Sequence, residues 1–205
     1  GFQLAARRAD LSQASADARP GGMVALMGAE IEVAARVCEG GTDVWIANDN
    51  APGQVVIAGT PEGLAAAGER ARQLGVRRVM ALAVGHAFHT PLLADAAAGL
   101  RPFLEGLTFQ ESATPVVANT DALGHTDPTC WPDQLTRHLV EPVRWRESQR
   151  TLAASGATTF IEVGPGRVLA GLAKRTVPDV TVLNVTTPDD VSNLLATNTL
   201  AGATR

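Results

Sequence analysis

The sequence has no long hydrophobic run. Its apolar stretches are short and are broken by Gly, Arg or Asp, and none approaches the roughly 20 residues that a membrane-spanning helix needs. Residues 1–8 contain no apolar core followed by a cleavage site, so they do not resemble a secretory signal. We therefore expect no membrane partner and a cytoplasmic location.

Cysteine is scarce, and positive charge is not concentrated anywhere in the chain. Cys38 and Cys130 are the only cysteines among 205 residues and have no C-x-x-C spacing, which predicts a reduced protein without disulfides. The net charge is −4 and no basic stripe is present to hold a phosphate backbone, so nucleic acid is not an expected partner. A hydrophobic share of 45% and a charged share of 19% are typical of a globular protein.

A nucleophile in a sharp strand-to-helix turn is also missing from these residues. The chain contains no G-x-S-x-G sequence and no equivalent with Cys. The serines all lie in expected helices or loops without such a turn: Ser12, Ser15, Ser112, Ser148, Ser155 and Ser192. We therefore expect no activated serine within this sequence.

Residues 21–84 predict a small α+β unit. The expected strands lie at 23–27, 44–47, 54–59 and 79–84. The expected helices lie at 30–39 and 60–74, and Asn, Asp, Pro and Gly predict a turn at 48–53. The resulting βαββαβ order is typical of a ferredoxin-like fold.

The rest of the chain predicts helices that alternate with strands. One helix, at 2–17, precedes the small unit. The elements expected after Gly85 are a helix at 91–105, a strand at 114–118, a loop at 121–133, helices at 134–139 and 147–154, a strand at 158–163, a helix ending near Arg175 and a strand at 180–185. The helix at 91–105 has an expected buried stripe of Leu92, Leu93, Ala96, Leu100, Phe103 and Leu104. This alternation favours a parallel α/β sheet. The sequence thus divides into residues 1–20, 21–84 and 85–205.

Two histidines, His86 and His89, lie between an expected strand end and an expected helix start. Loops at that junction hold functional residues in many α/β proteins. The positive end of the helix dipole disfavours imidazolium there, which suits a general base, although two loop histidines with local hydrogen bonds fit equally well. A zinc site with His125, His138 and Cys130 is a further alternative, but no H-E-x-x-H motif or cysteine pair supports it.

Two adjacent arginines, Arg7 and Arg8, lie on the first expected helix. They form either a solvated charged face or a site where one guanidinium turns inward to hold a carboxylate in two parallel hydrogen bonds. The residues alone leave both interpretations open.

A glycine-containing turn at 162–166 follows an expected strand and begins a helix. This arrangement suggests a dinucleotide site, but Leu169 stands where the G-x-G-x-x-G motif requires its last glycine. A tight turn that needs glycine for backbone room is the favoured interpretation.

Four motifs together resemble one family. They are HAFH at 86–89, NDNAPGQVVIAG at 48–59, LVEPVRW at 139–145 and FIEVGPGRVL at 160–169. In this order they resemble the acyltransferase domains of polyketide synthases, which transfer malonyl from malonyl-CoA to an acyl carrier protein, and HAFH is the version that accompanies malonyl. The resemblance implies an α/β fold: an α/β-hydrolase-like parallel sheet, partial here, with an inserted ferredoxin-like α+β subdomain.

The resemblance also implies a catalytic histidine and its support. The last histidine of HAFH, His89, would be the base. His138 stands where bacterial fatty-acid homologues have Gln, and its main-chain carbonyl would orient the catalytic histidine. No metal and no bound cofactor are implied, because the phosphopantetheine is carried by the partner.

The resemblance further implies a set of substrate-binding residues. The family pattern R-G-x-x-x-Q matches from Arg8, which would hold the malonyl carboxylate; Ala9 replaces the usual glycine, which leaves Arg7 open. His86, Phe88 and Asn50, which lie in the matched motifs, would contact the substrate.

The family's serine, in a G-H-S-x-G turn, has no counterpart in this sequence. We expect it in a segment N-terminal to this chain. The other expected partners are an acyl carrier protein and a neighbouring ketosynthase domain. Two other functions stay open: a non-catalytic structural or carrier-protein-docking piece of a synthase, and a free-standing ferredoxin-like sensor of small molecules.

Overall fold

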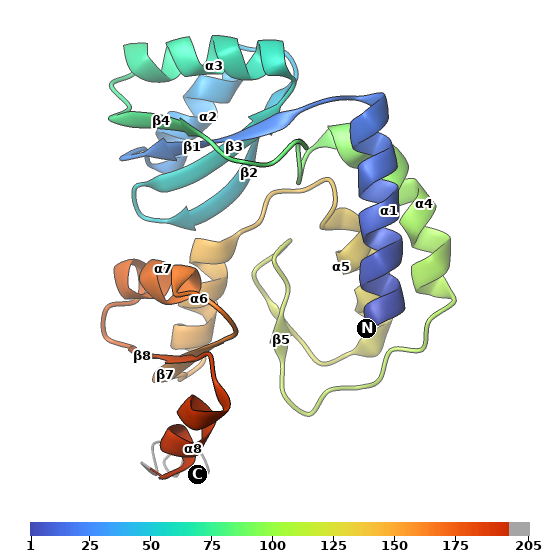
Figure 1. Cartoon of the computed structure of the whole chain (residues 1–205), viewed down its shortest axis with the longest axis vertical. Coiled ribbons are helices and arrows are strands. Elements are labelled where there is room, and N and C mark those ends of the chain that lie inside the picture. Colours follow the sequence, from blue (N-terminus) through green and yellow to red (C-terminus); the bar gives the residue numbers. More distant parts are fainter. Residues whose placement is uncertain (197–205) are drawn as a thin grey trace.

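A computed structural model describes residues 1–196 of the chain. Figure 1 shows a small sheet with helices above it, a pair of long helices α1 and α4 beside it, and a C-terminal group of helices and strands below it. The helices α1 and α4 contact each other although they are far apart in the sequence.

No helix in the described part of the chain combines the length and the apolar character that crossing a membrane would require.

The helices and strands follow one another without a repeat. The α-helices are α1 (Phe2–Ala18), α2 (Ile31–Glu39), α3 (Pro61–Gln73), α4 (Ala94–Glu105), α5 (Trp131–Arg137), α6 (Trp145–Ala154), α7 (Val168–Thr176) and α8 (Pro188–Ala196), with 3-10 helices η1 (Pro91–Leu93) and η2 (Pro128–Cys130). The strands are β1 (Gly22–Met27), β2 (Val44–Ala51), β3 (Gln54–Gly59), β4 (Arg78–Ala81), β5 (Val116–Val117), β6 (Gly124–His125), β7 (Thr159–Val163) and β8 (Thr181–Val185).

The small sheet has the strand order β2-β3-β1-β4, and every neighbouring pair is antiparallel. Along the chain its elements run β1-α2-β2-β3-α3-β4, the order expected from the sequence. The other described sheets are the antiparallel pair β5-β6 and the parallel pair β7-β8. The fold is therefore of mixed α/β class.

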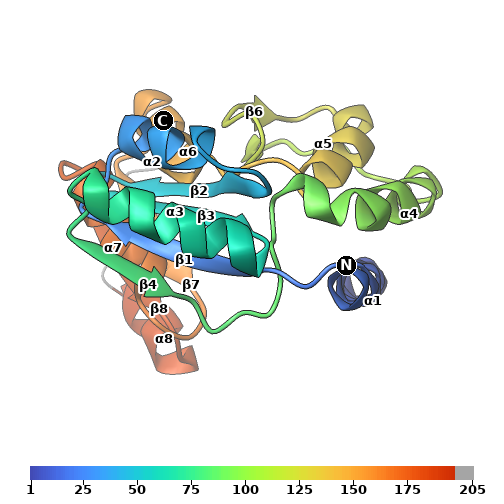
Figure 2. The same cartoon turned by 90° about the horizontal axis from the view of Figure 1, so that it is seen from above.

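Alternating side chains let the small sheet bury both of its faces. On β3, Val55 and Ile57 pack with α2 and α3, whereas Val56 and Ala58 point to the opposite face. Figure 2 shows α2 and α3 lying over the strands. The opposite face packs against Ala87, which lies in the loop after β4. One face of the sheet thus forms its own core, and the other supports the HAFH loop.

The strand β2 continues through a segment predicted to be a turn. Residues 48–51 extend the strand, which pairs with β3 through two register shifts. The turn is confined to Pro52 and Gly53, and the φ of Gly53 is +71°. Asn and Asp are poor strand formers, but here a tertiary contact supplies pairing. The amide of Val143 donates to the carbonyl of Ala47 at 2.8 Å, and the carbonyl of Val143 accepts from the amide of Asp49 at 2.9 Å.

An ion-pair group secures the same stretch of β2. Arg146 on α6 is 8% exposed, and its guanidinium donates to Asp49 at 2.9 Å and to Glu30 at 2.8 Å. The other oxygen of Glu30 accepts from the amide of Gly53 at 2.9 Å. Burial raises the pKa of Asp49, and the charge and hydrogen bonds of Arg146 oppose that rise. This group ties the small sheet to the C-terminal part of the chain.

Several other predicted boundaries were wrong. The strand expected at 79–84 ends at residue 81, and the strand expected at 114–118 keeps only two residues. The loop expected at 121–133 contains β6 and η2, and α5 begins at Trp131 because Pro132 is tolerated in the first turn of a helix. The helix α8 was not predicted, and residues 197–205 of the predicted third part lie outside the described residues.

A helical layer packs beside the sheet around α4. Its buried stripe of Leu93, Ala96, Leu100 and Leu104 contacts Leu139, which follows α5. The expected stripe along 91–105 is thus confirmed, although Leu92 and Phe103 are only partly buried. This packing places the end of α5 next to the HAFH loop.

The close packing around Gly59 predicts that the small sheet cannot accept an added methyl group there without moving. A Cβ there would lie 2.8 Å from Cα of Val44 on β2 and closer still to the Asp43 carbonyl, so the backbone would have to move. We expect Gly59→Ala to lower the free energy of unfolding by about 1–3 kcal/mol, measured by chemical denaturation. In Gly68→Ala on α3, the Cβ meets nothing within 4 Å, and the better helix former should stabilise by about 1 kcal/mol. Equal effects of the two changes would contradict this account.

Candidate active site

The HAFH loop is anchored by Thr90, which is fully buried. Its hydroxyl donates to the carbonyl of Ala87 at 2.7 Å and accepts from the amide of Leu92 at 3.3 Å, so it caps η1 and closes the loop on itself. Ala87 is buried against the small sheet. Phe88 and His89 lie between Ala87 and Thr90 in the sequence. They are therefore held between the small sheet and the start of η1.

His89 is fixed in one tautomer by the main chain of His138. Its Nδ1 lies 2.7 Å from the carbonyl oxygen of His138, which can only accept, so Nδ1 carries the proton and Nε2 has a free lone pair. The backbone of His89 has a φ of +61°, a left-handed conformation that costs an L-residue about 1–2 kcal/mol. The geometry at His138 is the one that the predicted main-chain role requires.

Burial keeps both imidazole rings neutral. Burial lowers the pKa of His89; the hydrogen bond to the His138 carbonyl opposes this, and the charge of Arg8 adds to it. Burial, with smaller contributions from His89 and Arg8, lowers the pKa of His138 to about 4. The two ring centroids are 4.8 Å apart. At neutral pH, His89 is therefore ready to accept a proton at Nε2.

A cavity of about 380 Å³ lies between α1, the small sheet and the HAFH loop. Its lining residues come from segments far apart in the sequence: Arg8, Met23, Asn48, Asn50, Val56, Leu82, Phe88 and His89. Apolar residues from β1 and β3 form part of its wall, and the polar groups are a guanidinium, two amides and an imidazole. This is a small site with one permanent positive charge.

The structure distinguishes the two arginines of α1. Arg7 is exposed, whereas Arg8 is half-buried and lines the cavity. Burial lowers the pKa of Arg8, and no carboxylate within residues 1–196 forms an ion pair with it. A guanidinium in such a position favours an anionic ligand.

Most of the predicted site residues come together, with one exception. Arg8, Asn50, Phe88 and His89 line the cavity, and His138 supports His89 from behind. His86 is not among the lining residues; its ring packs on Phe88 with centroids 5.1 Å apart. In the described part of the chain, the Nδ1 of His86 is buried and has no hydrogen-bond partner.

Two polar residues of the site were not predicted. Asn48 lines the cavity, and its place at the start of the N-x-N motif was the signal that could have found it. Asn119 donates from Nδ2 to Nε2 of His138 at 3.3 Å. No sequence motif marks Asn119, because its contact depends on how the chain folds back after β5.

The sequence also suggested two other ligands, a metal ion and the phosphate of a dinucleotide. No group of three or more His, Cys, Asp or Glu residues within the described range is placed to hold a metal ion. At the glycine turn, the carboxylate of Glu162 accepts from the amides of Leu169 at 3.0 Å and Ala170 at 2.8 Å. The start of α7, where a phosphate would bind, is thus occupied by a side chain of the protein itself.

Comparison with known proteins establishes the family. The model of the acyl transferase domain matches residues 2–202. The chain therefore belongs to the acyl transferase family, as its four motifs predicted. It is 36% identical over 195 residues to the malonyl CoA-acyl carrier protein transacylase of Bacillus subtilis, and 36% identical over 194 residues to that of Synechocystis. These alignments cover 93% and 95% of the chain but 62% and 64% of the relatives.

Solved structures give the same result. The acyl carrier protein S-malonyltransferase of Vibrio cholerae has 36% identity and a TM-score of 0.90, over 94% of this chain and 64% of that one. A malonyl-transacylase solved in complex with a type II PKS acyl-carrier protein has 34% identity and a TM-score of 0.90, over 96% of this chain and 64% of that one. The chain thus spans somewhat less than two thirds of the length of these relatives.

The low pKa of His138 predicts a pH-dependent stability. Below about pH 6.5 the unfolded chain gains a proton at this residue while the folded chain resists it, so stability is lost as pH falls toward 4. Replacing His138 with Gln should reduce the difference in unfolding free energy between pH 7 and pH 4.5 by on the order of 1 kcal/mol. Chemical denaturation of both proteins at the two pH values measures this. The account fails if wild type and His138→Gln lose the same stability.

Proposed function

We propose that this chain is the larger part of a malonyl-CoA:acyl-carrier-protein acyltransferase. The observation that supports this most directly is the placement of two groups on one cavity: His89, with a free Nε2, and Arg8, which lacks a carboxylate partner in the described residues. Malonyl has a thioester to be attacked and a free carboxylate to be held. The cavity offers one group for each.

In the proposed reaction, His89 moves a proton in each of two half-reactions. Its Nε2 accepts the hydroxyl proton as a serine attacks the malonyl thioester, and then gives that proton to the departing thiolate of coenzyme A. In the second half, the phosphopantetheine thiol of the carrier protein loses its proton to Nε2 and attacks the acyl-serine ester. The serine oxygen leaves and regains a proton from His89.

The nucleophilic serine comes, in this proposal, from a segment N-terminal to this chain. The alignments leave more than a third of the length of these relatives uncovered, which leaves room for such a segment. The other proposed partners are an acyl carrier protein and a neighbouring ketosynthase domain of a polyketide synthase, in the cytoplasm. The reaction requires no cofactor bound to the chain.

The proposed fold has two parts. Residues 21–84 form a ferredoxin-like subdomain, supported by the strand order of the small sheet. Residues 1–20 and 85–205 belong to an α/β-hydrolase-like part, supported by the parallel pair β7-β8 and by the contact of α1 with α4. In this proposal the active site lies where the two parts meet.

Replacing the base tests the assignment of His89. In the completed domain, meaning this chain joined to the serine-bearing segment, His89→Ala should lower the rate of acylation by about 10²–10⁴-fold. His86→Ala is the matched control, because His86 packs beside Phe88 outside the lining and should mainly alter substrate choice. Single-turnover acylation with labelled malonyl-CoA measures both. Equal losses would mean that the base is wrongly assigned.

Replacing the arginine tests the choice of substrate. Arg8→Ala should lower kcat/KM for malonyl-CoA far more than for acetyl-CoA, because only malonyl gains a charge-assisted pair worth about 1.5–3 kcal/mol. The malonyl-to-acetyl ratio should fall by roughly tenfold or more. Arg8→Lys should restore only part of it, since an ammonium lacks the planar fork.

The exposed neighbour supplies the control for this experiment. Arg7→Ala removes the same charge from the same helix but from outside the cavity, so the ratio should stay unchanged. A ratio that collapses in Arg7→Ala instead would transfer the role to Arg7. If neither variant changes it, the chain does not select malonyl through α1, and a structural or docking role becomes the better account.

A further inference from the structure

The position of the His138 carbonyl depends on the end of α5. His138 is the C-cap residue of this helix, and its amide donates to the carbonyl of Gln134 at 2.9 Å. Its own carbonyl is the acceptor that holds Nδ1 of His89. A small rotation of the last turn of α5 would therefore remove the acceptor from His89, so whatever fixes this turn also fixes the tautomer of His89.

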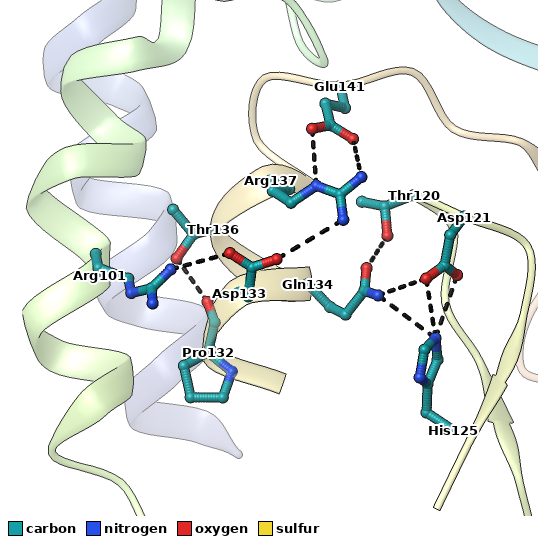
Figure 3. Close-up of polar contacts among 10 residues, drawn as sticks. All are labelled: Arg101, Thr120, Asp121, His125, Pro132, Asp133, Gln134, Thr136, Arg137 and Glu141. Carbon is teal, nitrogen blue, oxygen red and sulfur yellow. Dashed lines mark hydrogen bonds and ion pairs between the residues drawn. The ribbon is translucent and has the colours of Figure 1, made fainter. Parts of the chain in front are cut away.

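A buried amide fixes the last turn of α5. The side chain of Gln134 accepts from the hydroxyl of Thr120 and donates from Nε2 to Asp121 at 2.5 Å. Gln134 and Thr120 are 7% and 5% exposed. Figure 3 shows Gln134 reaching from α5 to both partners, and the ring of His125 lies beside Asp121 and within 3.4 Å of the Gln134 amide nitrogen. We call Thr120, Asp121 and Gln134 the Gln134 clamp.

The segment that bears the clamp is itself held in place. The amide of Ala122 donates to the carbonyl of Ala118 at 2.9 Å, which closes a turn that contains Thr120 and Asp121. The amide of Leu123 donates to Asp121 at 3.0 Å, and Nε2 of His125 donates to it at 3.0 Å. Burial by itself would raise the pKa of Asp121, but these hydrogen bonds outweigh it and the pKa is lowered. The acceptor of the clamp is therefore an ionised carboxylate.

The same turn touches His138 directly. The side chain of Asn119 donates to Nε2 of His138 at 3.3 Å, and its carbonyl accepts from the amide of Arg144 at 2.9 Å. The turn at 118–122 thus contacts α5 through Gln134 and the ring of His138 through Asn119. It also contacts the start of α6 through the amide of Arg144. Its contacts converge on the residue that orients His89.

We propose that Gln134, held by Thr120 and Asp121, is a positioning residue for His89: the clamp sets the end of α5 so that the His138 carbonyl accepts a hydrogen bond from Nδ1–H of His89. This inference rests on the proposed function for its effect on catalysis, but its structural step concerns His89 alone. None of the three clamp residues lines the cavity, so Gln134 touches no substrate bound there.

The chain offers clean variants for this proposal. Thr120→Val has the same shape but loses the hydroxyl, and Thr120→Ser keeps it. Gln134→Leu removes the hydrogen bonds of the amide to Thr120 and Asp121, together with its 3.4 Å contact to His125. Asp133→Asn is the matched control: Asp133 lies on α5 next to Gln134, but its ion pairs with Arg101 and Arg137, which Figure 3 draws, are exposed to solvent.

The first measurement is the tautomer of His89 in the purified 205-residue chain. Nitrogen-15 NMR distinguishes a protonated from an unprotonated ring nitrogen, and the His89→Ala variant assigns the signal among the four histidines. Wild type, Thr120→Ser and Asp133→Asn should show the proton on Nδ1. Thr120→Val and Gln134→Leu should show it shifted toward Nε2.

The second measurement is acyl transfer in the completed domain. Gln134→Leu and Thr120→Val should lower kcat by about 10- to 100-fold, the loss typical when a partner that orients a functional histidine is removed. KM for malonyl-CoA should change less than about twofold, because the cavity lining is untouched. Thr120→Ser should restore most of kcat, which a general loss of stability would not explain.

The outcomes separate this proposal from the proposed function. An unchanged tautomer and kcat in folded Thr120→Val would overturn the positioning role, and that variant decides if Gln134→Leu does not fold. If the tautomer shifts as expected but wild type transfers no acyl group, the clamp stands and the acyltransferase proposal fails. If transfer occurs in wild type and both variants retain kcat despite a shifted tautomer, the clamp does not serve catalysis.

Discussion

The hydrogen bond between Nδ1 of His89 and the carbonyl of His138 is the contact on which the site depends. It joins residues that are 49 positions apart, one in the loop after β4 and one at the end of α5. A single main-chain acceptor decides where the imidazole proton resides, and it leaves Nε2 unprotonated in a ring that lines the cavity. The left-handed backbone of His89 persists because this bond and the capped loop around Thr90 hold it.

The small sheet supports this contact because its two faces have different tasks. The face with Val55 and Ile57 packs under α2 and α3 and gives the sheet a core of its own. The other face, with Val56 and Ala58, is free to support the HAFH loop and to form part of the cavity wall. The ion pairs of Arg146 then hold β2 against α6, so the small sheet stays fixed to the C-terminal part of the chain.

Charge in the site is distributed unevenly. The rings of His89 and His138 are buried and neutral, and Arg8 is the one cationic side chain in the cavity lining. A half-buried guanidinium without a carboxylate partner is costly unless a ligand supplies the anion, which makes the site complementary to a small carboxylate. The proposed malonyl specificity thus follows from the same burial that keeps the histidines neutral.

The sequence by itself determined the family, the βαββαβ order of residues 21–84 and the buried stripe of the helix at 91–105, and its HAFH motif pointed to His89 as the candidate base. These properties are local or depend on short motifs. Side-chain periodicity, helix caps and motifs can all be seen in a single sequence. Tertiary structure alone showed that Arg8 and not Arg7 lines the cavity, placed His86 outside that lining and brought Asn119 to His138. It also extended β2 through Asn48 and Asp49, against their propensities, because Val143 and Arg146 supply partners from nearly a hundred residues away. Contacts between distant segments decide burial, tautomer and strand length, and no local pattern encodes them.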